Sequence, residues 1–336
     1  MPEVPLRIGV LGAAKIVPNA LLKPARHNAD VVVAAVAARN PRRAAEYAAE
    51  RGIPTVHPTY EALLADDSLD AIYNPLPNGL HGHWTIAALE AGRHVLCEKP
   101  FTANADEAQL VADAAAASGL VVMEAFHWRY HPLAARMVEI MRSGELGELR
   151  HIETAMCFPN FKRTDIRWNP TLAGGALMDT GCYAIHWART LAGSEPEVTA
   201  ATSLLRAPGV DRKTVVDLSF PGGATGRVTS SMWSRSVLRL MARAEGTKGA
   251  LHVFNPIAPQ AYSRMTVEVG GKKRHEKVPA HGTTYAYQLR AFVAAVRDGA
   301  PTLTPPAESV ANMRVIDAAY RAAGLEPRSP TAVTSH

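Results

Sequence analysis

The sequence predicts an α/β protein in which a doubly wound parallel sheet is followed by an α+β unit with an open, mainly antiparallel sheet. Two observations predict this class. Short apolar runs alternate with alanine-rich helical stretches in residues 1–126, and strand-like runs then follow one another without helices between them. The 336 residues suffice for about two domains. Hydrophobic residues make up 47% of the chain and charged residues 20%, which excludes a disordered protein.

The expected strands of the parallel sheet are near-continuous apolar runs, as in strands buried on both faces. They span residues 6–11, 31–37, 71–74, 95–97 and 121–123. Helical patterns separate them at residues 41–51, 60–65, 80–91 and 104–118. Because strand and helix alternate, we expect helices on both faces of the sheet. This first domain spans residues 1–126.

A different pattern is found in residues 127–330, the second expected domain. It predicts helices at 132–142 and 175–192, then strands at 198–205, 214–220, 225–233, 237–244 and 262–269. The last run has the period of two of a strand, since the apolar residues Met265, Val267 and Val269 alternate with polar ones. Consecutive strands at this spacing predict an antiparallel sheet. Two helices close the chain at 285–297 and 307–323.

Composition and charge exclude several classes of protein. No apolar run reaches the ~18–20 residues of a spanning helix, and no export signal is visible, so we expect a cytoplasmic protein without membrane contact. The three cysteines have no paired spacing, which suits a reducing compartment. The net charge of +5 comes from scattered residues. The short basic clusters at 42–43 and 272–274, the second at an expected turn between strands, favour a small anionic ligand over nucleic acid.

The first expected strand runs into a tight turn with the sequence G-V-L-G-A-A-K. A dinucleotide-binding turn needs one glycine for the bend and a second small residue where the backbone approaches the pyrophosphate. Gly12 and Ala14 suit these roles, and Lys15 and Ile16 then open a helix whose free N–H groups can bind phosphate. The match predicts a Rossmann-type fold. Because it is degenerate, an ordinary strand-to-helix turn remains an alternative.

The end of the second expected strand discriminates between two cofactors. NAD binding calls for a carboxylate that holds the ribose hydroxyls, and none follows this strand. A small residue followed by Arg39, with Arg43 nearby, suits the 2′-phosphate of NADP, because a guanidinium binds phosphate in a bidentate manner. We therefore predict NADP rather than NAD. The alternative is that Arg39 and Arg43 are solvated caps of the next helix.

Three motifs occur in order along the chain: the glycine-rich turn, E-K-P at residues 98–100, and G-G-A-L-M-D-T-G-C-Y at residues 174–183. With this set the chain resembles the glucose-fructose oxidoreductase/inositol dehydrogenase (Gfo/Idh/MocA) family over nearly its whole length. The third motif ends in a tyrosine rather than a histidine, and in this it resembles the sugar and dihydrodiol branches of the family more than the inositol branch. The resemblance implies a Rossmann domain, a second domain for substrate binding and oligomerisation, and an NADP-dependent oxidoreductase acting on a sugar, polyol or related diol.

The resemblance implies catalytic roles for Lys99, Asp179 and Tyr183, with Pro100 in a cis bond that holds the turn. Independently, the spacing of Asp179 and Tyr183 places them on one face of a helix. Oxidising an alcohol requires loss of a hydride to the nicotinamide and of a proton to a base. Since tyrosine is a poor base near neutral pH, we expect Lys99 to lower the pKa of Tyr183, and Asp179 to orient a second hydroxyl. The alternative is a buried tyrosine that packs between the domains.

The resemblance also implies residues that line the cofactor and the substrate. The expected cofactor contacts beyond the first turn are Pro75, Asn78, His81, Glu98, Lys99, Arg167 and Trp168. The expected substrate contacts are His127, Arg129, Asp179, Tyr183 and His186, with Glu124 also near the cleft. For the residues outside the catalytic set, packing or capping contacts are the alternative.

Two histidine pairs, His81/His83 and His127/His131, have a spacing that can chelate a metal ion. Neither has a nearby Cys or the Glu of an H-E-x-x-H motif, so we predict no metal site.

Two other functions remain open. An NAD-dependent glycosidase of the same fold is disfavoured by the missing ribose-binding carboxylate. A non-enzymatic sugar-sensing protein is disfavoured because a sensor has no need of the set Lys99, Asp179 and Tyr183. Finally, an open sheet with an apolar alternate face needs a cover, so we expect a homodimer or homotetramer formed through it.

Overall fold

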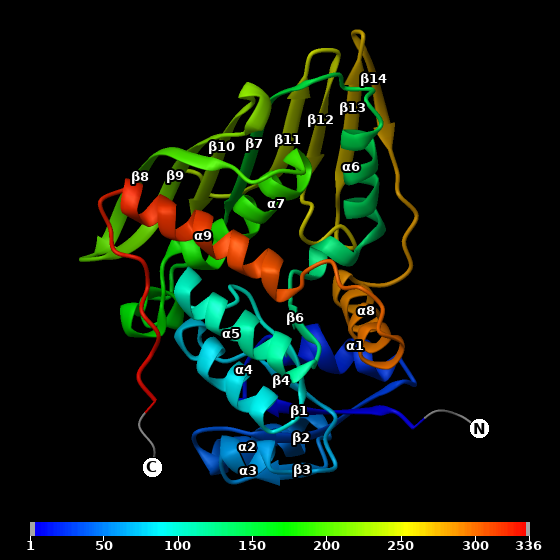
Figure 1. Cartoon of the computed structure of the whole chain (residues 1–336), viewed down its shortest axis with the longest axis vertical. Helices are drawn as coiled ribbons and strands as arrows, with labels where there is room; N and C mark the ends of the chain where they lie inside the picture. Colours follow the sequence, from blue (N-terminus) through cyan, green and yellow to red (C-terminus); the bar gives the residue numbers. More distant parts are fainter. Residues whose placement is uncertain (1–3, 334–336) are drawn as a thin grey trace.

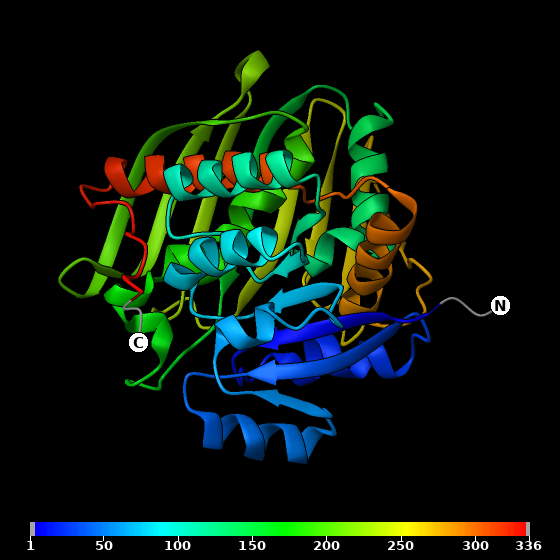
Figure 2. The ribbon, with the colours of Figure 1, turned by 60° about the horizontal axis from the view of Figure 1, so that its bottom comes forward.

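The computed structural model describes residues 4–333 and contains two sheets. One is a six-stranded sheet with the order β3-β2-β1-β4-β5-β6, and the other is an eight-stranded sheet with the order β14-β13-β12-β11-β7-β10-β9-β8. In both ribbon views the helices α5 (Ala105–Ser118) and α9 (Pro306–Ala322) lie side by side between the sheets (Figure 1, Figure 2).

The six-stranded sheet is parallel throughout. Its strands are β1 (Leu6–Leu11), β2 (Val31–Ala37), β3 (Thr55–His57), β4 (Ala71–Asn74), β5 (His94–Cys97) and β6 (Val122–Glu124). This strand order is that of a doubly wound dinucleotide-binding fold, as the sequence predicts. The edge strand β3 has only three residues and no apolar run, which explains why it gives no sequence signal.

Helices α2 (Pro41–Arg51), α3 (Tyr60–Leu64), α4 (His81–Glu90) and α5 lie close to their expected positions. The helix expected after β1 is instead a π turn, η1 (Pro18–Leu22), followed by the four-residue helix α1 (Lys23–Arg26). This short crossover covers little of the sheet. Helix α8 (Thr284–Asp298) completes the helical layer on this face of the parallel sheet, because Leu289 and Phe292 pack in the same cluster as Ile8 and Val10 (Figure 1).

The eight-stranded sheet is mixed and mostly antiparallel, since only β10 and β7 pair in parallel. Its strands are β7 (Leu149–Cys157), β8 (Glu197–Ala207), β9 (Val210–Ser219), β10 (Thr225–Ser231), β11 (Arg239–Gly246), β12 (Gly249–Phe254), β13 (Arg264–Val269) and β14 (Lys272–Glu276). Three of them, β7, β12 and β14, were not expected. The basic cluster 272–274 was expected at a turn, but it begins β14, and Gly270 and Gly271 form the turn with positive φ.

The two faces of the eight-stranded sheet differ in polarity. Its inner face is apolar, and residues such as Ile152, Val216, Val228, Leu251 and Val267 belong to the same buried cluster as α7 (Cys182–Ala192). Its outer face carries a row of polar side chains on neighbouring strands, namely Asp217, Arg227, Glu153, Arg243 and His252. Helices of the same chain cover the apolar inner face, while the outer face also carries a small apolar cluster of Ala155, Cys157 and Met241. Assembly through the open sheet therefore stays a prediction.

The helix expected over residues 175–192 has two parts, a π turn η6 (Leu177–Gly181) and then α7. Asp211, which is fully buried, accepts a hydrogen bond from the Leu177 backbone N–H at 2.7 Å. Arg328 binds the same carboxylate at 2.8 Å and the Tyr320 hydroxyl donates to it at 2.9 Å. A side chain at Gly175, whose φ is 139°, would collide with this carboxylate. The start of η6 is thus held by residues far along the chain.

Candidate active site

Lys99 lies two residues after the end of β5, at the carboxyl end of the six-stranded sheet, where ligands of doubly wound folds bind. The Lys99–Pro100 peptide bond is cis. Lys99 Nζ donates to Asp179 Oδ1 at 2.9 Å and to the Asp179 backbone carbonyl at 3.1 Å. The structure thereby brings the E-K-P turn and the glycine-glycine motif together, as the resemblance implies.

Asp179 lies between two cations. Its Oδ2 is 3.0 Å from Arg167 Nε, and Arg167 also contacts Asp165. Burial raises the pKa of Asp179, but Lys99 and Arg167 outweigh burial and leave this pKa below its usual value. Burial lowers the pKa of Lys99, and the attraction of Asp179 reverses this to a net increase. All three groups are therefore charged at neutral pH, and Arg167 is held by Asp179.

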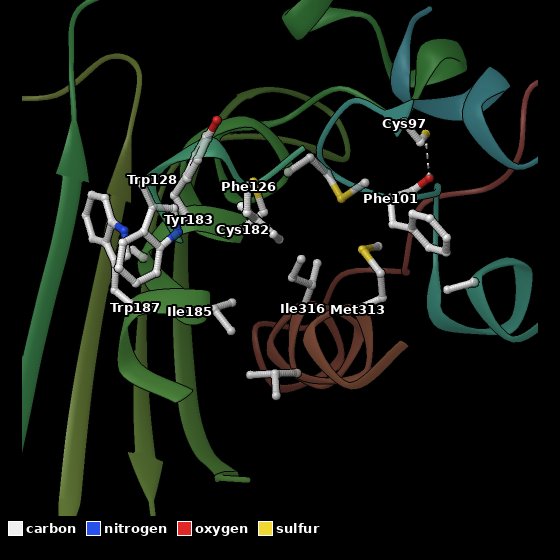
Figure 3. Packing of buried hydrophobic residues seen from close by; sticks show 14 of the residues in the cluster. Cys97, Phe101, Phe126, Trp128, Cys182, Tyr183, Ile185, Trp187, Met313 and Ile316 are labelled. Atoms are coloured by element: carbon white, nitrogen blue, oxygen red, sulfur yellow. Dashed lines mark hydrogen bonds between the residues drawn. The ribbon is translucent and has the colours of Figure 1, made fainter. Parts of the chain in front are cut away.

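Tyr183 is 4% exposed, and its ring centroid lies 5.0 Å from Lys99 Nζ. The close-up shows its hydroxyl pointing away from the apolar cluster that includes Cys182 and Ile185 (Figure 3). Burial raises the pKa of Tyr183 well above its usual value. The expected lowering of this pKa by Lys99 is therefore wrong for this state of the protein. Asp179 neutralises the Lys99 ammonium group, and the desolvation of the phenol dominates.

His127 is the other expected substrate residue beside this group. Its Nδ1 lies 2.7 Å from the Thr284 hydroxyl oxygen, and its ring stacks on Tyr285 with centroids 4.0 Å apart. The His127 and Tyr183 ring centroids are 5.9 Å apart. Burial, assisted by the positive charge of Lys99, lowers the pKa of His127 to about 3, so its ring is neutral. Sequence reasoning missed Thr284 and Tyr285, because they lie on α8, far along the chain.

Arg129 and His186 do not join this group. Both line a separate cavity together with Arg189. His186 Nδ1 accepts a hydrogen bond from the buried Trp128 Nε1 at 3.2 Å. Nearness to His127 and Tyr183 in the sequence is therefore no guide to their position.

The turn after β1 has the geometry that a pyrophosphate requires. Gly12 has a φ of 87°, a conformation that favours glycine, and its N–H donates to the Ala37 carbonyl at 2.6 Å. Within residues 4–333, the N–H groups of Ala14, Lys15 and Ile16 make no backbone hydrogen bond. They are available as phosphate donors, so this turn fits a dinucleotide.

Two side chains of α2 brace the glycine-rich turn. Arg43 donates to the Ala13 carbonyl at 2.9 Å, and the Tyr47 hydroxyl donates to the Ala14 carbonyl at 2.9 Å. Sequence reasoning missed Tyr47, although its place one turn after Arg43 was a usable signal. The cap of α2 is the Asn40 side chain, which accepts from the Arg43 N–H at 3.1 Å, so the arginine side chains are not the caps. Arg39 is exposed at the end of β2.

The loop after β4 connects several parts of the molecule. Asn78 Nδ2 donates to the Ala173 carbonyl at 3.1 Å, while Pro75 is buried. His81 is buried, with its ring nitrogens 2.6 Å from the Leu76 carbonyl and 2.8 Å from the Pro100 carbonyl. Burial lowers the pKa of His81 to about 4. His81 therefore joins the loop to the E-K-P turn.

Glu98 and Trp168 are both buried. Glu98 Oε1 accepts from the Tyr73 hydroxyl at 2.6 Å, and burial raises the pKa of Glu98. Trp168 lies beneath the Arg206 guanidinium, whose central carbon is 4.5 Å from the ring centroid. Both side chains thus have partners within the protein.

The carboxyl-terminal strap, residues 325–331, ties loops of both sheets together. The Thr331 N–H donates to the Gly79 carbonyl at 2.7 Å, and its hydroxyl donates to the Thr171 carbonyl at 2.6 Å. Asn104 Nδ2 donates to the Arg328 carbonyl at 2.7 Å. Through Arg328 and Asp211, the strap also reaches the start of η6.

In the described part of the chain, no group of three or more His, Cys, Asp or Glu residues is arranged to hold a metal ion. Residues 4–333 also contain no helix of the length and apolar character needed to cross a bilayer.

Comparison with known proteins identifies two family matches. Residues 6–126 match the model described as oxidoreductase family, NAD-binding Rossmann fold. Residues 134–252 match the model described as GFO/IDH/MocA C-terminal domain. The two matches follow the two sheets in order along the chain.

Relatives align over nearly the whole chain. The D-xylose 1-dehydrogenase (NADP(+)) 2 of Haloferax volcanii is 41% identical over 323 residues, covering 95% of this chain and 97% of the relative. The dTDP-3,4-didehydro-2,6-dideoxy-alpha-D-glucose 3-reductase of Streptomyces antibioticus is 36% identical, covering 90% of this chain and 92% of the relative.

Solved structures agree with this alignment. The aldose-aldose oxidoreductase from Caulobacter crescentus, complexed with glycerol, superposes with a TM-score of 0.88 at 26% identity, covering 96% of this chain and 98% of that one. KijD10, a 3-ketoreductase from Actinomadura kijaniata in complex with NADP and TDP-benzene, superposes with a TM-score of 0.86 at 29% identity, covering 94% and 97%. The chain therefore belongs to the Gfo/Idh/MocA family of oxidoreductases, and its amino-terminal half is a Rossmann fold of the NAD(P)-binding class.

Proposed function

We propose that this protein is an NADP-dependent oxidoreductase that interconverts a hydroxyl and a carbonyl group on a sugar, polyol or related diol. The observation that carries the proposal is the Lys99–Asp179 ion pair, with an N–O distance of 2.9 Å, beside the Tyr183 ring. It joins a cation and a phenolic proton donor at the carboxyl end of the parallel sheet, where a bound nicotinamide would lie.

In this proposal residues 1–126 bind the cofactor and residues 127–330 bind the substrate. The free N–H groups of Ala14, Lys15 and Ile16 hold the pyrophosphate. Arg39 holds the 2′-phosphate, assisted by the charge of Arg43, and no carboxylate lies among residues 38–43 to bind the ribose of NAD instead. The nicotinamide supplies or accepts the hydride at the substrate carbon.

Tyr183 handles the proton. Its raised pKa keeps the phenol protonated at neutral pH, so it donates a proton to the carbonyl oxygen in reduction and takes one back in oxidation. The Lys99 ammonium stabilises negative charge that develops on the same oxygen. Because Asp179 already binds Lys99 and Arg167, its main task is to hold Lys99 in place; a second substrate hydroxyl binds its remaining lone pairs.

The relatives support the substrate class. The names of the Haloferax volcanii and Streptomyces antibioticus proteins describe action on a pentose and on a nucleotide-linked hexose. The mouse relative, 32% identical over 259 residues, is named trans-1,2-dihydrobenzene-1,2-diol dehydrogenase. All three names describe substrates in which two neighbouring carbons each bear oxygen. A site with several hydroxyl-binding groups accommodates such substrates.

The test is a coupled pair of measurements. The absorbance of reduced cofactor is followed with aldoses and diols, using NADP⁺ or NAD⁺, while fluorescence titration compares NADPH with NADH. Turnover with NADP⁺ and tighter binding of NADPH support the proposal. Tighter binding of NADH would contradict the NADP assignment, and binding without turnover on any aldose or diol would contradict the substrate class.

We further propose that the protein forms a homodimer or homotetramer through the outer face of the eight-stranded sheet, where polar side chains surround the apolar cluster Ala155, Cys157 and Met241. The row of alternating charges on this face, including Asp217, Arg227 and Glu153, offers hydrogen-bonding groups to a second copy. Light scattering after size-exclusion chromatography tests this, because the mass of a single chain, 36.0 kDa, would contradict it.

A further inference from the structure

A cavity lies away from Lys99, among the ends of several helices. It has a volume of about 360 Å³. Its walls come from η3 (His127–Tyr130), the end of α6 (Pro132–Arg142), the end of α7 and the start of α9. The lining residues are mainly polar: Arg129, Arg142, His186, Arg189, Thr190, Gly193, Ser194, Glu195, Leu303 and Glu308. The catalytic group Lys99, Asp179 and Tyr183 is not among them.

Both carboxylates that line this cavity bind one and the same arginine. Arg189 is buried and lies 2.6 Å from Glu195 Oε1 and 3.1 Å from Glu308 Oε2. It also contacts Asn312 Oδ1 at 3.5 Å. Glu195 and Glu308 are thus bound to the same guanidinium at the wall of the cavity.

The other two arginines lack such partners. In the part of the chain that the structure describes, the guanidinium groups of Arg129 and Arg142 form no hydrogen bond and no ion pair. Arg129 is half-buried, and burial lowers its pKa. The positive charge of Arg142 acts in the same direction, whereas Tyr130 and the more distant Glu308 carboxylate act in the opposite one. Two guanidiniums without a bound acid thus face one polar cavity, which an anion would stabilise.

We propose that this cavity binds a phosphate-sized oxyanion, either free or as the phosphoryl group of a small metabolite. Arg129 and Arg142 bind its oxygens through charge-assisted hydrogen bonds, and the hydroxyls of Thr190 and Ser194 line the same space. The volume lies at the lower end of the range for small-molecule pockets, about 300–1,000 Å³, which suits such a ligand.

The cavity and the proposed catalytic group share elements of structure. His186 lines the cavity and lies on α7 one turn after Tyr183, and Arg129 lies two residues after His127. An anion here therefore binds next to the catalytic helix, at a place distinct from the glycine-rich turn. This separation allows binding at the two places to be told apart by mutation.

The test uses thermal unfolding and titration calorimetry of the full chain with inorganic phosphate, and separately with glycerol phosphate, at constant ionic strength. The expected result is saturable binding with a rise in Tm, because a ligand that binds only the folded state stabilises it. Arg142→Gln and Arg129→Gln should each raise the Kd at least tenfold. Tighter binding of glycerol phosphate than of phosphate identifies a phosphorylated metabolite, and equal binding identifies the free anion.

Two variants serve as comparisons. Arg163→Gln removes the same charge from an exposed loop that lines no part of the cavity, and it should leave the Kd unchanged. Arg39→Ala should also leave phosphate binding in place. The proposal is overturned if phosphate does not bind saturably, or if Arg39→Ala abolishes binding while Arg142→Gln retains it. Arg142 is exposed at the end of α6, so its variant tests the site even if Arg129→Gln fails to fold.

Discussion

Lys99 and Asp179 form an ion pair across 80 residues of sequence, and it joins the turn after β5 to the π turn η6. Their side chains are only 15% and 11% exposed, so water screens the pair weakly. Arg167 binds the second carboxylate oxygen at 3.0 Å. The pair therefore links the two sheets at the place where the proposed chemistry occurs.

Lys99→Ala should lower kcat about 10²–10⁴-fold, the usual contribution of a group that assists proton transfer. Steady-state kinetics with the best aldose or diol measure this loss. Fluorescence titration should show little change in the Kd for NADPH, because Lys99 binds Asp179 and the turn Gly12–Ile16 binds phosphate in our proposal. Lys162→Ala, on an exposed loop, is the control. Unchanged kcat in Lys99→Ala would contradict the role.

Asp179→Asn should move the alkaline limb of the pH–rate profile to lower pH. In the native protein Asp179 raises the pKa of Lys99, whereas burial and Arg167 lower it. Without the carboxylate the main group that raises this pKa is gone, while burial and Arg167 still lower it, so Lys99 loses its proton at a lower pH. The measurement is kcat across the neutral and alkaline range. An alkaline limb that stays in place would show that Lys99 is not the titrating group.

Tyr183→Phe should reduce kcat about 10²–10⁴-fold while leaving NADPH binding and the fold intact, because only the hydroxyl is removed. This hydroxyl points away from the apolar cluster, so its loss does not disturb packing (Figure 3). Tyr262→Phe, at an exposed position, is the matched control. Full activity of Tyr183→Phe would support the alternative of a purely packing tyrosine.

Arg39→Ala should weaken NADPH binding about 10- to 100-fold, since a hydrogen bond to a charged group contributes about 1.5–3 kcal/mol. Binding of NADH, which lacks the 2′-phosphate, should change little. Arg42→Ala is the control, because Arg42 lies three residues after Arg39, is exposed in the first turn of α2 and pairs with Glu46. Equal loss of NADPH and NADH affinity would contradict the 2′-phosphate assignment.

Arg328→Gln should lower the free energy of unfolding by about 3–5 kcal/mol, because it leaves the buried Asp211 carboxylate without its cation. Denaturant unfolding measures this loss. Arg227→Gln, which breaks the exposed pair with Asp217, should cost no more than about 1 kcal/mol. A similar small loss in both variants would show that the strap does not stabilise the start of η6.

Local sequence patterns predict the parts of this protein that depend on neighbouring residues. The apolar runs that form β1, β2, β4 and β5 are buried on both faces, so their sequences are continuous and recognisable. Strand β7 mixes apolar and polar residues because one of its faces is polar, and β14, at the edge of its sheet, has no apolar residue. Neither strand gives such a signal in the sequence.

The motifs by themselves determined the family, the dinucleotide-binding turn and the identity of Lys99, Asp179 and Tyr183 as candidates, because each motif is a short run of residues. Tertiary structure alone decided that Asp179 binds both Lys99 and Arg167, that burial raises the pKa of Tyr183, and that Arg129 and His186 face a different cavity. The physical reason is that charge pairing and desolvation depend on which distant elements pack together. The spacing of residues along the chain does not reveal that packing.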